Sequence, residues 1–297
     1  MAAETPLLDK KFLERLERLT IHWQRSFSGL VGGHNMSNFA GSGQEFLDHR
    51  NYYQGDDLRA VNWRAYMRLD KMVLKMFQIE PRVPVRLLLD ISTSMTAGEG
   101  DLSKFRYAKR LAAALCYVGL VRLDTIEIQP FSTKLHQNSR SGGGRHRITP
   151  VMNFIDALEP TGTTDFLAVS KAFLNEYPQR GLVIVISDFL DDAGAERALK
   201  YIADYGNELL LIQIWTEEDR NPPWRGEVEF VDAESGERLR IHVDENARRK
   251  YTAGFDRFSA AIRQVALRAD GRYAGLPTST AIEDAIFGPL VQIRSIA

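Results

Sequence analysis

The chain has 297 residues, of which 44% are hydrophobic and 26% are charged, and this is the composition of an ordinary globular protein. Its 38 Lys and Arg residues nearly balance its 39 Asp and Glu residues, which disfavours nucleic acid as a partner because phosphate binders usually carry a basic excess. The single cysteine, Cys116, excludes an internal disulfide and is typical of a protein from a reducing compartment.

The N-terminal part of the chain predicts a helix rather than a targeting segment. Residues 7–23 (LLDKKFLERLERLTIHW) place Phe12, Leu16 and Leu19 on one face and charged residues on the other. A signal peptide would need an apolar stretch where these charges stand. The strongest apolar runs elsewhere, such as LLLIQIW, are too short to span a bilayer. We therefore expect a cytoplasmic protein with no membrane insertion.

Residues 27–82 differ in composition and residue pattern from the rest of the chain. A loop rich in Gly, Ser and Asn is followed by mixed aromatic and charged residues, and KMVLKMFQIE alternates like a strand. The acidic Asp56 and Asp57 stand close to Arg50 and Arg59, and we expect ion pairs there rather than a cation site. We predict that residues 1–82, the N-terminal helix plus this extension, pack on a main domain formed by residues 83–297.

From residue 83 onward, apolar strands alternate with amphipathic helices. The strands that lead to Asp90 and Asp188, and the stretch NELLLIQIW, are apolar almost throughout, as expected for a parallel sheet buried on both faces. The predicted fold class is therefore α/β with a doubly wound, mostly parallel sheet. The alternation of strands and helices is interrupted at about residues 224–244. There, two stretches in which apolar and polar residues alternate flank the sequence ESGE, and this pattern predicts an inserted β-hairpin.

Oxygen-bearing side chains gather at the predicted strand ends. Asp90 and Asp188 each end an apolar strand, and Ser92 and Ser94 follow the first of them. Ligands of doubly wound sheets bind beyond the carboxyl ends of the strands, where the strand order reverses. Carboxylates and hydroxyls suit Mg²⁺, Mn²⁺ or Ca²⁺ rather than Zn²⁺. A metal held mainly by neutral hydroxyls would also attract an anionic oxygen from outside, such as a carboxylate of another protein.

These residues resemble a known metal site. Asp90-x-Ser92-x-Ser94, together with a threonine in GTTDF and Asp188 in ISDF, is similar to the metal-ion-dependent adhesion site of von Willebrand factor A domains. The resemblance implies that the serines and a threonine oxygen touch the metal, that both aspartates act largely through bound water, and that an acidic residue of the partner completes the shell. Thr164 is the favoured threonine because it directly precedes the Asp of the motif, and Thr163 is the alternative.

The segment upstream of these strands narrows the resemblance to one family. It resembles the segment that precedes the A-like domain in the domain-of-unknown-function 58 family, through Glu45-Phe46, residues 50–52 (RNY), residues 55–59 (GDDLR) and Trp63. Asn62 stands where this family usually has Asp, and Phe189 stands where many A domains have Gly. The resemblance implies a MoxR-type AAA+ ATPase as partner and a chaperone-like role in assembling or activating other complexes.

The leading functional hypothesis is a non-enzymatic, metal-dependent protein-binding module, because no nucleophile or general base stands beside the oxygen-rich motif. One alternative is a phosphatase-like hydrolase with Asp90 as nucleophile, although such enzymes need a second aspartate where Ser92 stands. A second alternative is a scaffold with a vestigial metal site. The basic, glycine-rich residues 139–147 lack the ending of a P-loop. They are either a solvated loop or a partner-contacting loop near the metal edge.

Overall fold

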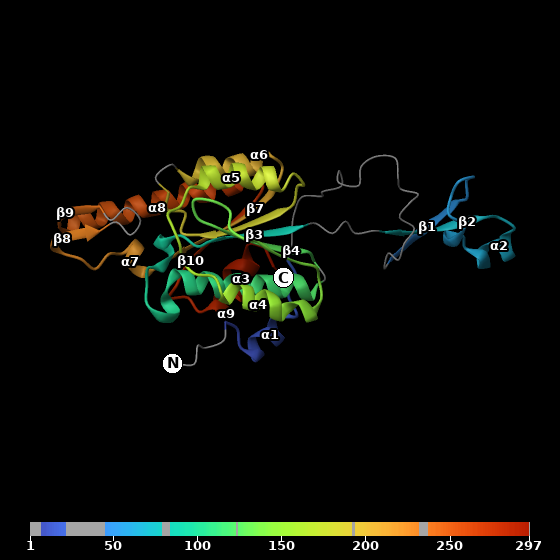
Figure 1. The fold of residues 1–297 in the computed structure, drawn as a ribbon, viewed down its shortest axis with the longest axis horizontal. Helices are drawn as coiled ribbons and strands as arrows, with labels where there is room; N and C mark the ends of the chain where they lie inside the picture. Colours follow the sequence, from blue (N-terminus) through green and yellow to red (C-terminus); the bar gives the residue numbers. More distant parts are fainter. Residues whose placement is uncertain are drawn as a thin grey trace. The chain divides into compact units, whose positions relative to one another are not determined.

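The computed structural model describes residues 7–21, 45–78, 84–122, 124–191, 194–231 and 237–296 (Figure 1). Contacts divide these residues into two units, each described by itself. The first unit contains residues 7–21 together with all described residues from 84 onward, and the second contains residues 45–78. The N-terminal helix, which the sequence groups with the extension, therefore belongs to the first unit. The loop predicted before residue 45 lies outside the described residues.

The second unit is a small hairpin with helical turns between its strands. Strand β1 (Glu45–Asn51) pairs antiparallel with β2 (Val73–Gln78), and the 3-10 turn η1 (Leu58–Ala60) and helix α2 (Trp63–Leu69) lie between them. The Arg50 guanidinium donates to both oxygens of Asp56, at 2.9 and 2.7 Å. Asp57 caps η1 by accepting from the Arg59 amide at 2.8 Å. The ion pair expected between Arg50 and Asp56 is confirmed.

A six-stranded sheet organises the first unit. Its strands are β3 (Val85–Asp90), β4 (Ile126–Phe131), β5 (Ser139–Ser141), β6 (Leu182–Ser187), β7 (Glu208–Trp215) and β10 (Arg272–Pro277). They lie in the order β10-β7-β6-β3-β4-β5, and every pair is parallel except β4 with β5. Counted within this sheet, this is the doubly wound order 3-2-1-4-5-6. The predicted fold class is confirmed, and the strand order reverses between β3 and β6.

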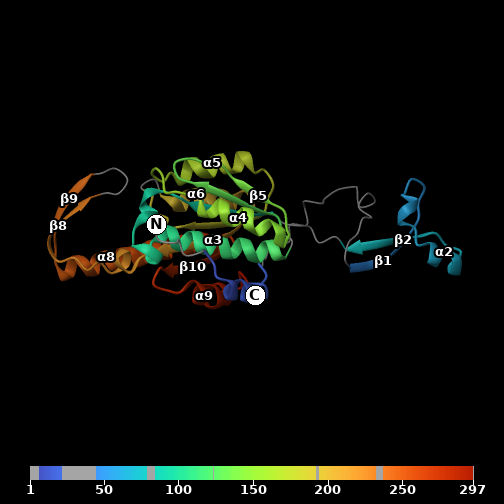
Figure 2. The ribbon, with the colours of Figure 1, turned by 60° about the horizontal axis from the view of Figure 1, so that its bottom comes forward.

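Helices cover both faces of the sheet (Figures 1 and 2). One layer consists of α1 (Lys10–Leu16), α3 (Lys104–Val121), α4 (Ile148–Asp156) and α9 (Ile282–Ala285), which continues into the π-helical turn η5 (Ile286–Leu290). The other layer consists of α5 (Phe166–Glu176), α6 (Ala195–Asp204) and the C-terminal part of α8 (Glu245–Arg268). Shorter pieces connect them: η2 (Thr93–Thr96), η3 (Gly100–Leu102), η4 (Arg145–Arg147) and α7 (Glu217–Arg220).

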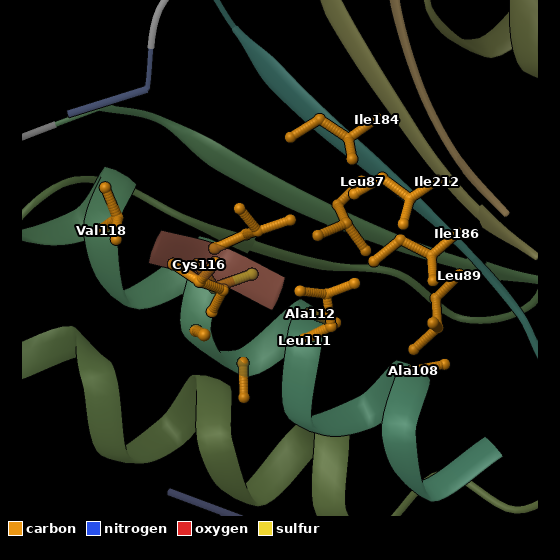
Figure 3. Close-up of a cluster of buried hydrophobic side chains, with 14 of the residues drawn as sticks. Leu87, Leu89, Ala108, Leu111, Ala112, Cys116, Val118, Ile184, Ile186 and Ile212 are labelled. Atoms are coloured by element: carbon orange, nitrogen blue, oxygen red, sulfur yellow. The ribbon is translucent and has the colours of Figure 1, made fainter. Parts of the chain in front are cut away.

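In the core between α3 and the sheet, alanines of the helix lie beside larger helix residues such as Leu111 and pack against large residues on the strands (Figure 3). Ala108 and Ala112 of α3 are fully buried against a set of strand residues that includes Leu87, Leu89, Ile184, Ile186 and Ile212. The small helix side chains let the helix approach the sheet closely. Cys116 is fully buried in the same layer, and its burial raises the pKa of the thiol to about 12.

The predicted hairpin is present as β8 (Gly226–Val231) and β9 (Arg238–Val243), which pair antiparallel. It lies directly before α8 in the chain and at the N-terminal end of that helix (Figures 1 and 2). None of the described helices combines the length and the apolarity that a membrane crossing would require.

The basic loop lies away from the edge where the alternative placed it. Ser141 of β5 pairs with Ile126 at the start of β4, so the chain leaves β5 at the amino-terminal edge of the parallel strands. Asp90 lies at their carboxyl-terminal edge. The part of that hypothesis that placed the loop near the metal edge is therefore wrong. Arg145 of this loop instead forms an ion pair with Glu17, at 2.6 Å.

The packing in Figure 3 predicts the cost of opening a cavity beside α3. Leu87→Ala should lower the free energy of unfolding by about 3 kcal/mol, because the buried methyl groups are lost and the rigid surroundings collapse only partly. The matched control is Leu267→Ala, at a leucine of α8 that is 49% exposed, and it should change stability by less than about 0.5 kcal/mol. Urea denaturation followed by circular dichroism measures both. Equal effects of the two substitutions would contradict this assignment of the core.

Candidate metal centre

Two loops meet where the strand order reverses at the carboxyl edge of the sheet. One follows β3, and the other precedes α5. Both the amide and the hydroxyl of Thr93 donate to the carbonyl oxygen of Gly162, at 2.9 and 2.8 Å. In the opposite direction, the amide of Thr161 donates to the carbonyl oxygen of Ile91, at 2.6 Å. These three hydrogen bonds hold the DxSxS loop and the GTTDF loop against each other.

Asp90 is the centre of the predicted site. Its side chain is fully buried at the end of β3, and one carboxylate oxygen accepts from the Ser92 amide at 2.9 Å. The other oxygen accepts from the hydroxyl of Ser187, the last residue of β6, at 2.5 Å. The Ser92 and Ser94 hydroxyls lie 3.0 Å apart, within hydrogen-bonding distance. The structure therefore brings the three residues of the DxSxS motif together and ties them to the neighbouring strand.

The electrostatic environment of Asp90 is unfavourable for a lone carboxylate. Burial and, next, the nearby charge of Asp188 raise its pKa to about 7, even though the hydrogen bonds from Ser187 and Ser92 lower it. Two carboxylates close together in a poorly solvated place repel each other and are hard to ionise together. A cation beside them would remove this penalty.

Asp188 lies directly after β6 and is 3% exposed. One of its carboxylate oxygens accepts from the Leu190 amide at 3.1 Å, and the other accepts from the Lys104 ammonium at 2.6 Å. Thr163 and Thr164 are both partly exposed, and the hydroxyl oxygen of Thr164 is buried. The participation of either threonine in a metal shell stays a prediction.

Sequence reasoning missed two groups that complete the charge pattern. Lys104, the first residue of α3, is 1% exposed, and its ammonium lies 2.6 Å from Asp188 and 3.5 Å from Asp219 of α7. Burial lowers the pKa of Lys104, but the two carboxylates together raise it above its ordinary value, so the ammonium stays charged. A lysine at the start of a helix gives no sequence signal of burial, because its partner Asp188 lies 84 residues away.

The residues present fit a divalent cation. With all three ionised, Asp90, Asp188 and Asp219 would carry three negative charges against the single positive charge of Lys104, a net charge of −2 that a divalent cation would balance. Among the described residues, no group of three or more His, Cys, Asp and Glu could hold a metal. A metal site here must therefore draw on hydroxyls, and hydroxyl plus carboxylate oxygens are ligands for Mg²⁺, Mn²⁺ or Ca²⁺.

Phe189, which departs from the A-domain pattern, is held by packing. Its φ angle of 61° lies in the left-handed region that favours glycine. Its ring is fully buried and stacks on Phe166, with centroids 5.6 Å apart and an interplanar angle of 21°. Phe166 in turn contacts Phe131 edge-on, at 5.3 Å. The aromatic cluster thus offsets the backbone strain beside Asp188.

A family model described as "Protein of unknown function DUF58" matches residues 48–261. Relatives include the uncharacterized protein Rv1480 of Mycobacterium tuberculosis and the uncharacterized protein Mb1516 of Mycobacterium bovis. Each is 27% identical to this chain over 241 residues, which cover 80% of this chain and 75% of the relative.

Solved structures with a similar fold include BatB from Bacteroides thetaiotaomicron, at 20% identity and a TM-score of 0.44, covering 71% of this chain and 98% of that one. An aerotolerance-related membrane protein from Bacteroides fragilis matches at 19% identity and a TM-score of 0.45, covering 71% and 99%. The SpRpn10 VWA domain matches at 11% identity and a TM-score of 0.39, covering 69% and 93%. Because these scores are below 0.5, the fold assignment rests on the strand order of the sheet itself.

The raised pKa of Asp90 predicts a pH dependence of stability in EDTA. The folded-state pKa of about 7 exceeds the value of about 4 in the unfolded chain, so the folded state binds this proton more tightly. The free energy of unfolding should therefore fall as the pH rises from about 4 through about 7, by on the order of 3 kcal/mol. Asp90→Asn should abolish this part of the fall. Parallel urea titrations of both proteins across this range measure it, and identical pH profiles would contradict it.

The conformation of Phe189 predicts an unusual order of stabilities. Both Phe189→Ala and Phe189→Gly should destabilise the protein, because each removes the buried ring. The glycine variant should be the more stable of the two by about 1 kcal/mol, since only glycine takes the left-handed conformation without strain. Thermal unfolding of the two variants checks the order. An alanine variant more stable than the glycine variant would show that the backbone relaxes once the ring is gone.

Proposed function

This chain belongs to the DUF58 family, and from that premise we propose that it is a non-enzymatic module that binds a protein partner through a divalent cation. One observation carries the proposal. Two buried carboxylates, Asp90 and Asp188, lie at the switch point of the sheet beside the hydroxyls of Ser92 and Ser94. The negative charge of this group is poorly solvated, so a bound cation would stabilise it. Its oxygen atoms are suitable ligands for Mg²⁺, Mn²⁺ or Ca²⁺.

In this proposal, Ser92, Ser94 and Thr164 supply oxygens to the cation, with Thr163 as the alternative threonine. Asp90 and Asp188 act mainly by orienting bound water and balancing the charge. The cation supplies a positive centre that accepts one more anionic ligand. An acidic residue of the partner provides this ligand, so that the chain and its partner share the metal shell.

The hydrogen bonds of Asp90 support recognition over catalysis. Both of its carboxylate oxygens accept hydrogen bonds, from the Ser92 amide and the Ser187 hydroxyl, and its side chain is fully buried. A nucleophilic carboxylate needs a free oxygen that can approach the substrate. A phosphatase-like role for Asp90 is therefore the weaker hypothesis.

The partner expected from the family resemblance is a MoxR-type AAA+ ATPase. We propose that the module works with such an ATPase in the cytoplasm, in a chaperone-like role during the assembly or activation of other protein complexes. The near-neutral net charge of −1 fits a protein partner better than nucleic acid.

The decisive experiment is a direct binding assay between the full chain and a purified MoxR-type ATPase from the same organism. The complex should form in Mg²⁺ and be lost in EDTA. Asp90→Ala combined with Ser92→Ala should weaken binding at least about tenfold, which corresponds to about 1.4 kcal/mol. The matched control is Asp204→Ala, at an exposed aspartate of α6, and it should bind like the wild type.

The outcomes separate the three functional hypotheses. Binding that is equally strong in Mg²⁺ and EDTA, or unchanged in the double variant, would contradict a metal-bridged contact. Hydrolysis of a generic phosphate ester that Asp90→Asn abolishes would favour the enzyme. An absence of any calorimetric response to Mg²⁺, Mn²⁺ or Ca²⁺ would favour the scaffold with a vestigial site.

A further inference from the structure

An arm of the first unit rises from the same sheet edge as the candidate metal centre. The arm is defined here as residues 217–256: α7, the β8–β9 hairpin and the N-terminal half of α8, with residues 232–236 outside the described part. It follows β7, which runs parallel to β6, so β7 ends at the edge where Asp188 lies. Figures 1 and 2 show the hairpin and the beginning of α8 extending beyond the sheet.

The base of the arm is a compact set of hydrogen bonds. Asp219 of α7 forms a capping box with Thr216, in which its amide donates to the threonine hydroxyl and its carboxylate accepts from the threonine amide. Helix α7 is joined to α8 by two contacts. Arg220 forms an ion pair with Asp256 at 2.9 Å, and the Thr252 hydroxyl donates to the Arg220 carbonyl oxygen at 3.1 Å. A displacement of Asp219 therefore affects both helices.

Lys104 connects this base to the metal centre. Its ammonium lies between two carboxylates at unequal distances, 2.6 Å from Asp188 and 3.5 Å from Asp219. Tyr251 of α8 lies close to the same charges. Burial raises its pKa, Asp219 raises it further, and Lys104 lowers it. One flexible lysine thus joins a proposed metal-site residue, the cap of α7 and the first turns of α8.

We propose that Lys104 transmits cation binding to the arm: a divalent cation at the centre takes over the neutralisation of Asp188, and the ammonium moves its main contact to Asp219. This inference rests on the proposed metal site. A divalent cation close to a buried ammonium repels it strongly, because few water molecules screen the charges. The four-carbon stem of lysine permits a shift of about 1 Å without a change in the backbone.

The shift stabilises the arm through Asp219. A contact of 3.5 Å is long for an ammonium–carboxylate hydrogen bond, whose usual length is about 2.7–2.9 Å. Shortening it would tighten the capping box of α7 and, through Arg220 and Thr252, the beginning of α8. The cation then has two effects on partner binding. It accepts the partner's carboxylate at the sheet edge, and it fixes the arm that stands beside this edge.

Hydrogen–deuterium exchange of the full chain, with and without saturating Mg²⁺, tests this coupling. In the wild type, Mg²⁺ should slow amide exchange in residues 217–220 and 245–256. Lys104→Met should abolish this slowing, and calorimetry should show Mg²⁺ binding at least about tenfold tighter, because the competing positive charge is gone. Asp219→Asn should also abolish the slowing and should weaken Mg²⁺ binding, because the displaced ammonium then has no second carboxylate to pair with. Lys109→Met, on the same helix, is the matched control and should behave like the wild type.

The results separate failure of this inference from failure of the proposed function. Mg²⁺ binding by all variants, with undiminished slowing of arm exchange in Lys104→Met, would overturn the coupling and leave the metal site standing. Absence of Mg²⁺ binding by the wild type would overturn both. Circular dichroism first checks the fold of Lys104→Met, since the substitution leaves Asp188 buried without its cation. If that variant does not fold, Asp219→Asn decides, because it keeps the ion pair between Lys104 and Asp188.

Discussion

Two aspartates that meet in a buried place impose the main constraint on this protein. Asp90 ends β3 and Asp188 follows the neighbouring parallel strand β6, and burial with mutual repulsion raises the pKa of Asp90. Each contact around them reduces that cost. The Ser187 hydroxyl and the Ser92 amide donate to Asp90, and the Lys104 ammonium donates to Asp188. Our functional proposal follows from the negative charge that remains.

The same helix that completes the core also positions the counter-charge. Ala108 and Ala112 let α3 lie close against β3 and β6, and this packing fixes the place where the helix begins. Lys104 is the first residue of α3. The hydrophobic packing of this helix on the sheet therefore positions the Lys104 ammonium at the sheet edge. The stability of the core and the electrostatics of the edge are therefore linked through one element.

The sequence predicted the parts of the site that are local. The order Asp-x-Ser-x-Ser at the end of an apolar strand correctly placed Asp90, Ser92 and Ser94 together, and alternation predicted the hairpin. One of the two alternatives for residues 139–147 placed this loop at the carboxyl edge of the sheet, near the metal centre. The short antiparallel strand β5 instead leads the chain to the amino-terminal edge of the parallel strands. The left-handed conformation of Phe189 was also not predictable, because it depends on Phe166 and Phe131, which lie far away in the sequence.

The sequence by itself determined the fold class, the family and the oxygen-bearing residues, because hydrophobic periodicity and short motifs act between near neighbours in the chain. Only the tertiary structure decided which charges face each other. The sequence marks Asp188 as a strand-end aspartate, but Lys104 of α3 and Asp219 of α7 have the appearance of ordinary solvated charges in the sequence. Their pairing depends on the order of strands in the sheet and on the layer in which each helix packs, and these are long-range properties of the whole unit.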